Sequence, residues 1–333
     1  MPYEQSWQMI SDARRILMTT HVRPDGDGLG SLAALLEAMT ALGKDVRVVL
    51  PSAPGPMYLF LHGLDRFEVL DRDVTPDRLP VDWDLLLIVD TCTWAQLGPL
   101  EPLVHNYAGR IVVIDHHQTR DDLEHVGLVD AGAAACSPMV LRLLEAGGAA
   151  ITPTMAESLF VSLASDTGWY RFPNVTPEVF RLAAHLQELG ADPDGVYERL
   201  YQSASPGRMR LLGEALSTLT ISPEGDVACF WVSGEMFRTA GAEQWDTENL
   251  INETQTIAGI VVSILLVEQE GGAIRVSLRS KRDVDVASVA ASFGGGGHAR
   301  AAGCTLTGPL PEARRAVLDA VGDAMGRTVS PAD

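Results

Sequence analysis

The sequence predicts an α/β protein with two domains, and two patterns carry this prediction. In the N-terminal part, short uninterrupted runs of Val, Ile and Leu alternate with helical stretches, which indicates strands buried on both faces of a parallel sheet. After about residue 206 the apolar residues instead alternate with polar ones, which indicates strands with only one apolar face. We therefore expect an N-terminal parallel-sheet domain with flanking helices and a smaller C-terminal α+β domain.

Polar side chains follow the predicted buried strands. The strands are expected at residues 16–18, 46–50, 85–89 and 111–114. Because ligands bind outside the carboxyl ends of strands in open α/β sheets, we expect the polar residues that follow three of these runs to share one edge of the sheet. These residues are His21, Asp25, Asp27, Asp90, Asp115, His116 and His117.

The segment from His21 to Ser31 is predicted to be a glycine-rich loop between the first strand and a helix at residues 32–42. It places one imidazole and two carboxylates, those of Asp25 and Asp27, within seven residues. A solvated turn and a metal site both explain this pattern. A calcium-binding EF-hand does not, because Leu29 falls where such a loop needs an oxygen ligand.

Three further motifs carry acidic residues, and two of them also have simple structural explanations. Asp90 could cap a turn after its strand, and Asp166 could mark the end of a helix predicted at residues 154–165. Asp115-His116-His117, which directly follows a buried strand, favours a functional role.

The four motifs together strengthen the functional interpretation. Four or five carboxylates at one edge would repel one another unless cations hold them ionised. Two divalent metals roughly 3.5–4 Å apart suit this set and favour phosphoryl displacement. The carboxylates fit manganese or magnesium, and the histidines favour manganese.

The second half contains a predicted linker and a second sheet. We expect a linker at residues 189–206, with a short helical piece at 196–201, between domains at 1–188 and 207–333. Strands are expected at 227–232, 258–268 and 273–280, the last two joined by a turn at Gly271-Gly272, and helices at 137–146 and 311–325.

A glycine run in the second half is a candidate anion site. Gly294 to Gly297 precede His298 and an alanine-rich stretch. Bare backbone N–H groups beside an expected helix start could bind an anion.

Composition limits the classes of partner. The chain has 333 residues and a net charge of −19, which argues against a basic groove for long nucleic acid. The four cysteines lack paired spacing, so we expect buried thiols in a reducing compartment. No run reaches the roughly 20 apolar residues of a membrane span, and the N-terminus does not resemble a signal peptide, so we expect a cytoplasmic protein.

The four motifs, in this order, resemble those of the DHH phosphoesterase superfamily. The Gly294–His298 run, with Arg279-Ser280-Lys281 upstream, is similar to the DHH-associated C-terminal domain. The length of the chain resembles the NrnA-like branch, which comprises nanoRNases that also dephosphorylate 3′-phosphoadenosine-5′-phosphate (pAp). The resemblance covers nearly the whole chain.

The resemblance implies an activity and a set of residue roles. It implies a manganese-dependent enzyme that hydrolyses RNA of two to five nucleotides and converts pAp to AMP with water activated by two metals. It implies ligands to a first ion (His21 and Asp25), ligands to a second ion (Asp27, His116 and Asp166), a bridging Asp90, catalytic or orienting roles for Asp115 and His117, and substrate contacts from Arg279, Gly295, Gly296, Gly297 and His298.

Several alternatives remain at this point. They are a pApA or cyclic di-AMP phosphodiesterase, a RecJ-like exonuclease, an exopolyphosphatase or pyrophosphatase, and a catalytically silent nucleotide-binding regulator. The aromatic residues Trp169, Tyr170 and Phe172 could stack on a base or belong to the core. The chain could also form a homodimer.

Overall fold

The computed structural model describes residues 2–79, 82–123, 126–327 and 329. The chain divides into two compact units, residues 1–203 and 204–333. The segment expected as a linker, 189–206, therefore lies mostly in the first unit. There it forms helix α8 (Pro193–Tyr201), whose Val196 is fully buried in the core of that unit.

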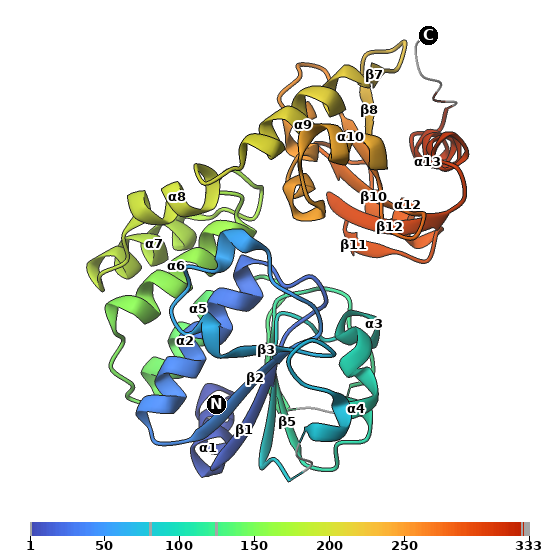
Figure 1. Cartoon of the computed structure of the whole chain (residues 1–333). Helices are drawn as coiled ribbons and strands as arrows, with labels where there is room; N and C mark the ends of the chain where they lie inside the picture. Colours follow the sequence, from blue (N-terminus) through green and yellow to red (C-terminus); the bar gives the residue numbers. More distant parts are fainter. Residues whose placement is uncertain (1, 80–81, 124–125, 328, 330–333) are drawn as a thin grey trace. The chain divides into compact units, whose positions relative to one another are not determined.

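The first unit is built on a six-stranded parallel sheet of order β3-β2-β1-β4-β5-β6 (Figure 1). The strands are β1 (Arg15–Thr19), β2 (Asp45–Leu50), β3 (Phe67–Val69), β4 (Leu85–Val89), β5 (Arg110–Asp115) and β6 (Val126–Val129). The four aliphatic runs are confirmed as β1, β2, β4 and β5. The sequence analysis missed β3 and β6, which are only three and four residues long.

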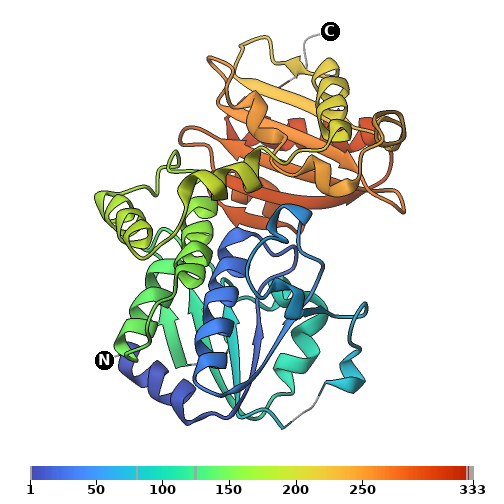
Figure 2. The same ribbon diagram turned by 60° about the vertical axis from the view of Figure 1, so that its left-hand side comes forward.

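Helices cover both faces of this sheet (Figures 1 and 2). One face packs against α1 (Pro2–Asp12), α2 (Gly26–Ala41), α5 (Ser137–Ala146) and α6 (Pro153–Asp166), and the other against α3 (Trp94–Leu97) and α4 (Glu101–His105). Helix α7 (Pro177–Glu188) packs on α6. The predicted helices at 137–146 and 154–165 are confirmed by α5 and α6.

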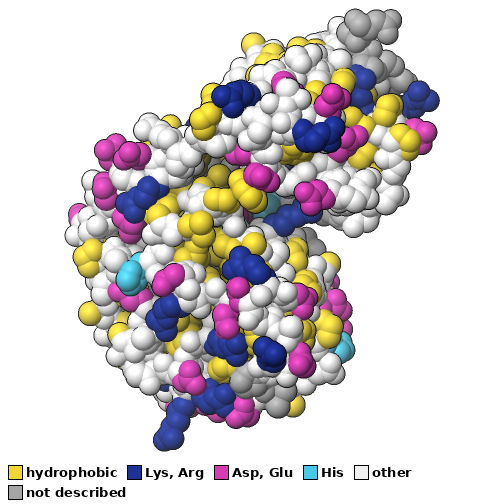
Figure 3. All heavy atoms as spheres, in the orientation of Figure 1, with side chains coloured by type: hydrophobic (Ala, Val, Ile, Leu, Met, Phe, Trp, Pro, Cys, Tyr) yellow, Lys and Arg dark blue, Asp and Glu magenta, His cyan; other side chains and the backbone are white. Residues whose placement is uncertain are grey.

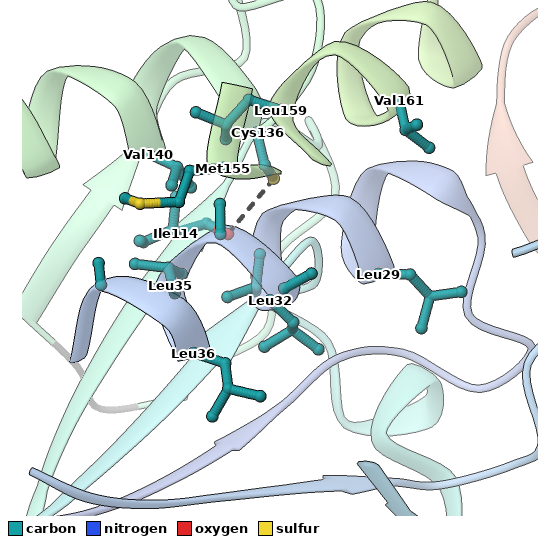
Figure 4. Packing of buried hydrophobic residues seen from close by; sticks show 14 of the residues in the cluster. Leu29, Leu32, Leu35, Leu36, Ile114, Cys136, Val140, Met155, Leu159 and Val161 are labelled. Atoms are coloured by element: carbon teal, nitrogen blue, oxygen red, sulfur yellow. Dashed lines mark hydrogen bonds between the residues drawn. The ribbon is translucent and has the colours of Figure 1, made fainter. Parts of the chain in front are cut away.

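The larger core of this unit lies between the sheet and the three helices α2, α5 and α6. Figure 4 shows Leu32 and Leu35 of α2, Met155 and Leu159 of α6 and Ile114 of β5, which all belong to one buried cluster. In the same view the thiol of Cys136 donates a hydrogen bond to the carbonyl oxygen of Ile114, at 3.5 Å. The core therefore joins the three elements β5, α2 and α6, which each carry one of the acidic motifs.

Helix α2 begins at Gly26, so the prediction of a loop that continues to Ser31 is wrong. Asp25 caps the helix, since its side chain accepts hydrogen bonds from the backbone N–H groups of Asp27 and Gly28. The glycines allow close helix packing and do not form a turn. A Cβ at Gly30 would collide with the carbonyl oxygen of Ser158 in α6.

The second unit is also an α/β layer structure. Its sheet has the order β11-β12-β10-β9-β8-β7, with one parallel pair, β8 with β9. The strands are β7 (Thr220–Ile221), β8 (Val227–Val232), β9 (Val262–Glu268), β10 (Ala273–Ser280), β11 (Gly296–His298) and β12 (Ala301–Thr307). The predicted hairpin of β9 and β10 is confirmed by their antiparallel register.

Helices lie on both faces of the second sheet. One face packs against α12 (Val286–Ala291) and α13 (Leu310–Ala324), and the other against α9 (Pro206–Ser217), α10 (Gly234–Ala240) and α11 (Ile251–Thr254). The helix start expected after the glycine run is wrong. Gly296–His298 instead pairs with Ala301–Gly303 as the hairpin of β11 and β12, because the glycines allow the two backbones to approach closely.

The surface agrees with the acidic composition. On the face of the described residues drawn in Figure 3, Lys and Arg side chains lie singly among Asp and Glu side chains. Within the described residues, no helix combines the length and the apolar character that a bilayer crossing needs.

Candidate metal centre

The candidate centre lies at the carboxyl ends of β1, β4 and β5. The sheet order reverses direction between β1 and β4, and crevices at such switch points are the usual ligand sites of open α/β sheets. Asp90 directly follows β4, and Asp115 ends β5. The predicted edge of polar side chains is therefore present, and Asp166 joins it from the end of α6.

His21 faces two carboxylates of this edge. Its Nε2 lies 3.2 Å from Oδ2 of Asp90 and 3.7 Å from Oδ1 of Asp25. Its Nδ1 lies 2.8 Å from the carbonyl oxygen of Val22, which can only accept a hydrogen bond. Nδ1 therefore carries the proton in the neutral ring, which leaves the lone pair of Nε2 directed at the carboxylates.

His116 repeats this arrangement with three carboxylates. Its Nε2 lies 3.2 Å from Asp166 Oδ2, 3.4 Å from Asp27 Oδ2 and 3.5 Å from Asp90 Oδ1. Its Nδ1 lies 3.3 Å from the carbonyl oxygen of Ala133. Each histidine is thus oriented by a backbone carbonyl so that Nε2 faces acidic oxygens, as in histidines that bind metals.

Asp90 lies between the two histidines. Its Oδ2 faces His21, and its Oδ1 faces His116 and also lies 3.6 Å from Nδ1 of His117. Its backbone has φ = 64°, a left-handed conformation that costs free energy for residues other than glycine and is most common for Asp and Asn. The two oxygens of this one buried carboxylate thus face two separate groups of ligands.

Asp27 is fully buried and is braced by neighbours from three elements. The backbone N–H of Cys136 donates to both of its carboxylate oxygens, at 2.8 and 3.0 Å. The hydroxyl of Ser162 on α6 donates to Oδ1, and that of Ser31 on α2 lies 3.5 Å from the same atom. These contacts fix the orientation of the carboxylate before any cation binds.

Asp115 and His117 form a separate pair beside the centre. Nδ1 of His117 donates to Oδ1 of Asp115 at 2.7 Å. Asp115 is fully buried, whereas the side chain of His117 is 33% exposed. This pairing directs Nε2 of His117 away from Asp115.

Burial and mutual repulsion shift the proton affinities of the carboxylates. Burial, together with the charge of Asp90, raises the pKa of Asp27 to about 7. Burial and Asp27 raise the pKa of Asp166 well above its ordinary value. Burial also opposes ionisation of Asp90, but hydrogen bonds from His116 and His21 outweigh it and keep the pKa of Asp90 below the usual range.

The histidines show the opposite tendency. Burial lowers the pKa of His116, but Asp90, Asp27 and Asp166 outweigh it and raise that pKa to about 11. Burial likewise lowers the pKa of His21, but Asp25 and Asp90 together outweigh this effect and raise that pKa well above its ordinary value. Without cations, the centre therefore balances its negative charge by keeping protons on imidazoles and carboxyls.

The donor atoms fit divalent cations. Among the described residues, Asp90 belongs to three groups whose ligand atoms all lie within 4.8 Å of one another. In these groups it joins His21 and Asp25, His116 and His117, or Asp27 and Cys136. A fourth group joins Asp27, His116 and Asp166. Carboxylate oxygens with imidazole nitrogens suit manganese, magnesium or other borderline divalent ions.

Comparisons with known proteins agree with this geometry. The model of the DHH family, N-terminal domain, matches residues 15–163, and that of the DHHA1 domain matches residues 228–327. The chain is 35% identical over 314 residues to the bifunctional oligoribonuclease and PAP phosphatase NrnA of Thermus thermophilus, and the match covers 94% of this chain and 90% of that protein. The chain belongs to the DHH family. It is accordingly a hydrolase that acts on phosphate ester bonds.

Two further proteins are similar to this chain over most of its length. The bifunctional oligoribonuclease and PAP phosphatase NrnA of Bacillus subtilis is 25% identical over 294 residues, with 87% of this chain and 89% of that protein covered. The crystal structure of an exopolyphosphatase-related protein from Bacteroides fragilis superposes with a TM-score of 0.89 and 24% identity over 97% of this chain and 96% of the other. This last likeness shows the fold alone.

The DHHA1 unit carries the residues predicted to bind substrate. In the sheet register, Ala301 of β12 lies opposite Arg279 of β10 on one side and opposite His298 of β11 on the other. Directly opposed residues of antiparallel strands project from the same face of a sheet, so Arg279 and His298 flank a small side chain on one face.

The neighbouring row of residues on the same face has even smaller side chains. Ser277, Gly303 and Gly296 lie opposite one another on β10, β12 and β11. The strand Gly296–His298 is exposed. Gly295 and Gly297 permit the hairpin, because a Cβ on either would collide with backbone atoms of β12. We call the residues Arg279, Ala301 and His298 with Ser277, Gly303 and Gly296 the polar strip.

The sequence analysis missed the residues that brace the centre. Cys136 was expected to be only a buried thiol; its burial is confirmed, but its backbone N–H also holds Asp27. Ser162 is unremarkable in the sequence of a helix. The one available signal is its spacing, since Ser162 lies four residues before Asp166 and hence on the same face of α6.

Proposed function

We propose that this chain hydrolyses short oligoribonucleotides to mononucleotides and dephosphorylates pAp to AMP, with two divalent cations, preferably manganese. The observation that supports this most directly is the placement of Asp90, whose two oxygens face separate groups of ligands. The similarity to NrnA of Thermus thermophilus, which extends over nearly all of both chains, supports the choice of substrates.

The residues suggest a division between two cations. His21 and Asp25 would hold one, Asp27, His116 and Asp166 the other, and Asp90 would contact both. When bound, two such cations would lower the pKa of a bound water toward neutrality and would neutralise charge on the phosphate. Because Asp27 and His116 are already braced by hydrogen bonds, this chain would lose little conformational freedom on binding them.

His117 is the candidate acid for the leaving group. Hydrolysis forms a bond between water oxygen and phosphorus and breaks the bond to the sugar oxygen, which then needs a proton. Burial lowers the pKa of His117, but the Asp115 carboxylate outweighs it and raises the pKa above the ordinary value, which favours the protonated imidazole. Its side chain is 33% exposed, so the imidazole borders the solvent from which a substrate would arrive.

We propose that the polar strip binds a terminal phosphate. Arg279 offers a planar pair of N–H donors, and the small side chains between Arg279 and His298 leave room for a tetrahedral anion. We further propose that residues 1–188 carry the catalysis and residues 207–333 the substrate recognition. A phosphate held by one arginine and one histidine would suit short substrates better than a long strand.

A substrate panel tests this proposal. The purified chain with manganese is assayed on pAp, pApA, cyclic di-AMP, RNA from two to 24 nucleotides, single-stranded DNA and pyrophosphate, with Asp90→Ala as the control. We expect the highest kcat/KM on RNA of two to five nucleotides and on pAp. Preference for cyclic di-AMP, long single strands or pyrophosphate would overturn the assignment.

A further inference from the structure

The chain makes an unusual turn directly after Asp166. Gly168, Trp169 and Tyr170 all have left-handed backbone conformations, with φ of 55°, 57° and 62°. This conformation is unfavourable for residues other than glycine, and aromatic residues gain nothing locally from it. The surrounding structure must therefore hold the turn in place.

Hydrogen bonds fix the turn to the metal centre. The backbone N–H groups of Arg171 and Phe172 both donate to the carbonyl oxygen of Thr167, at 2.9 and 3.0 Å. The side-chain amide of Asn174 donates to the carbonyl oxygen of Asp166 at 3.0 Å and to that of Ala134 at 3.1 Å. Phe172 is thereby held in a closed loop of chain whose two ends meet at Asp166.

The three aromatic side chains of this turn have different surroundings. The ring of Trp169 lies 5.8 Å from that of Phe160 and 5.0 Å from that of Tyr197. Both Trp169 and Tyr170 are half-buried and pack against the main core. Phe172 is 40% exposed. The structure therefore places the first two side chains in the core and leaves Phe172 at the surface.

Phe172 lies against bare backbone. A Cβ at Gly168 would collide with Cζ, Cε1 and Cε2 of the Phe172 ring, so the ring covers the position that a side chain would otherwise occupy. One side of the ring is thus supported by the turn, and 40% of the residue is exposed to solvent. An exposed phenyl ring held in this way is a flat apolar surface beside the Gly168 backbone, in a turn that directly follows Asp166.

We propose that Phe172 is the platform on which the nucleobase beside the scissile phosphate stacks. This inference rests on the proposed function, since it requires a nucleotide substrate at the metal centre. Stacking on an aromatic ring tolerates every base, because each base has a flat face. It would give an enzyme of short RNA affinity for the nucleoside without selecting a sequence.

The competing explanation is that Phe172 only covers the turn. Leucine distinguishes the two roles, because it keeps most of the apolar volume and lacks a flat aromatic face. Phe180 on α7 supplies a matched control. It is 56% exposed, and its ring stacks on that of Tyr170 at 5.8 Å.

The test is an equilibrium binding comparison on the full chain with excess manganese. AMP and ribose 5-phosphate carry the same phosphate and sugar but differ in the base, and calorimetry gives both dissociation constants. For Phe172→Leu we expect roughly tenfold weaker binding of AMP and unchanged binding of ribose 5-phosphate. Phe172→Trp should restore AMP binding, and Phe180→Leu should alter neither ligand. Phe172→Met replaces the leucine variant if that variant does not fold.

Two results would overturn the inference. One is equal affinity of the wild-type chain for AMP and ribose 5-phosphate. The other is an equal loss of affinity for AMP and ribose 5-phosphate in Phe172→Leu, which would indicate that Phe172 only covers the turn. Because binding is measured without turnover, these results are independent of the substrate panel. A chain that binds AMP through Phe172 but hydrolyses none of the proposed substrates would refute the proposed function alone.

Discussion

The metal centre and the polar strip, which we propose to bind phosphate, are built in opposite ways. In the centre, Asp27 and Asp115 are fully buried, and hydrogen bonds orient the histidines and Asp27. In the strip, Gly296 to His298 are exposed, and only the small Ala301 lies between Arg279 and His298 in the sheet register. The centre is thus suited to chemistry that requires fixed geometry, and the strip to capture of a charged group from solvent.

The two regions also differ in charge. The centre contains more carboxylates than its histidines can neutralise, so the pKa values of Asp27 and Asp166 are raised. The excess of negative charge would favour the binding of cations. In the strip, burial lowers the pKa of Arg279, whose guanidinium nevertheless stays charged at any physiological pH. Substitutions should therefore affect turnover at the centre and substrate affinity at the strip.

The largest effect is expected for Asp90→Ala. Loss of the carboxylate that faces both histidines should lower kcat on every substrate by on the order of 10³-fold or more, because several kcal/mol of charge stabilisation depend on the cations. Steady-state assays with manganese measure this loss. Substantial remaining turnover would mean that the centre is not the catalytic site.

Arg279→Ala should act on affinity. The loss of one charge-assisted contact, worth roughly 1.5–3 kcal/mol, should raise KM about ten- to hundredfold with little change in kcat or in bound metal. The exposed Arg282 gives the control, since Arg282→Ala should leave KM nearly unchanged. If Arg279→Ala instead removed the metals, the assignment of separate tasks to the two regions would be wrong.

Ser162→Ala tests whether the bracing of the centre matters. Without this hydroxyl, Asp27 loses a hydrogen bond, and manganese affinity should fall about tenfold, as for other residues that orient metal ligands. Ser158→Ala is the control, because the Ser158 hydroxyl lies on the same helix and donates to Thr154 instead. Calorimetric titration with manganese measures both variants, and equal affinities would show that Asp27 needs no support from α6.

The smallest effect concerns pH and stability. In the metal-free chain the pKa of Asp27, about 7, exceeds its value of 3.8 in an unfolded chain, so stability falls as pH rises from about 4 to 7. The raised pKa of His116, about 11, adds a loss in the same direction above pH 6.5. The gain in Tm on adding manganese should therefore be several degrees larger at pH 7.5 than at pH 5. A gain that does not grow with pH would contradict the charge imbalance.

The positions of the acidic motifs could be predicted from the sequence because buried parallel strands are conspicuous aliphatic runs. The runs before Asp90 and Asp115 fix both the strand and the edge at which each acid lies. The structural roles of the glycines could not be predicted from the sequence. Gly30 allows two helices to approach, whereas Gly297 allows two strands to pair, and a local pattern cannot distinguish these tertiary contacts.

Long-range contacts explain what the sequence could not predict. Cys136 and Ser162 touch Asp27 from positions 109 and 135 residues away. The sequence does not separate Phe172 from Trp169 and Tyr170, because all three are aromatic; the difference in their burial follows only from the fold. Such roles follow from packing, and they emerge only when the positions of α2, α5 and α6 are known.

In the proposed mechanism, Asp90 joins two cations in one buried centre. Electron paramagnetic resonance of the manganese-loaded chain tests this claim directly, because two ions that share a carboxylate are magnetically coupled. We expect two manganese ions per chain with a coupled spectrum, and uncoupled signals of lower stoichiometry in Asp90→Ala. An uncoupled single-ion spectrum from the saturated wild-type chain would contradict it.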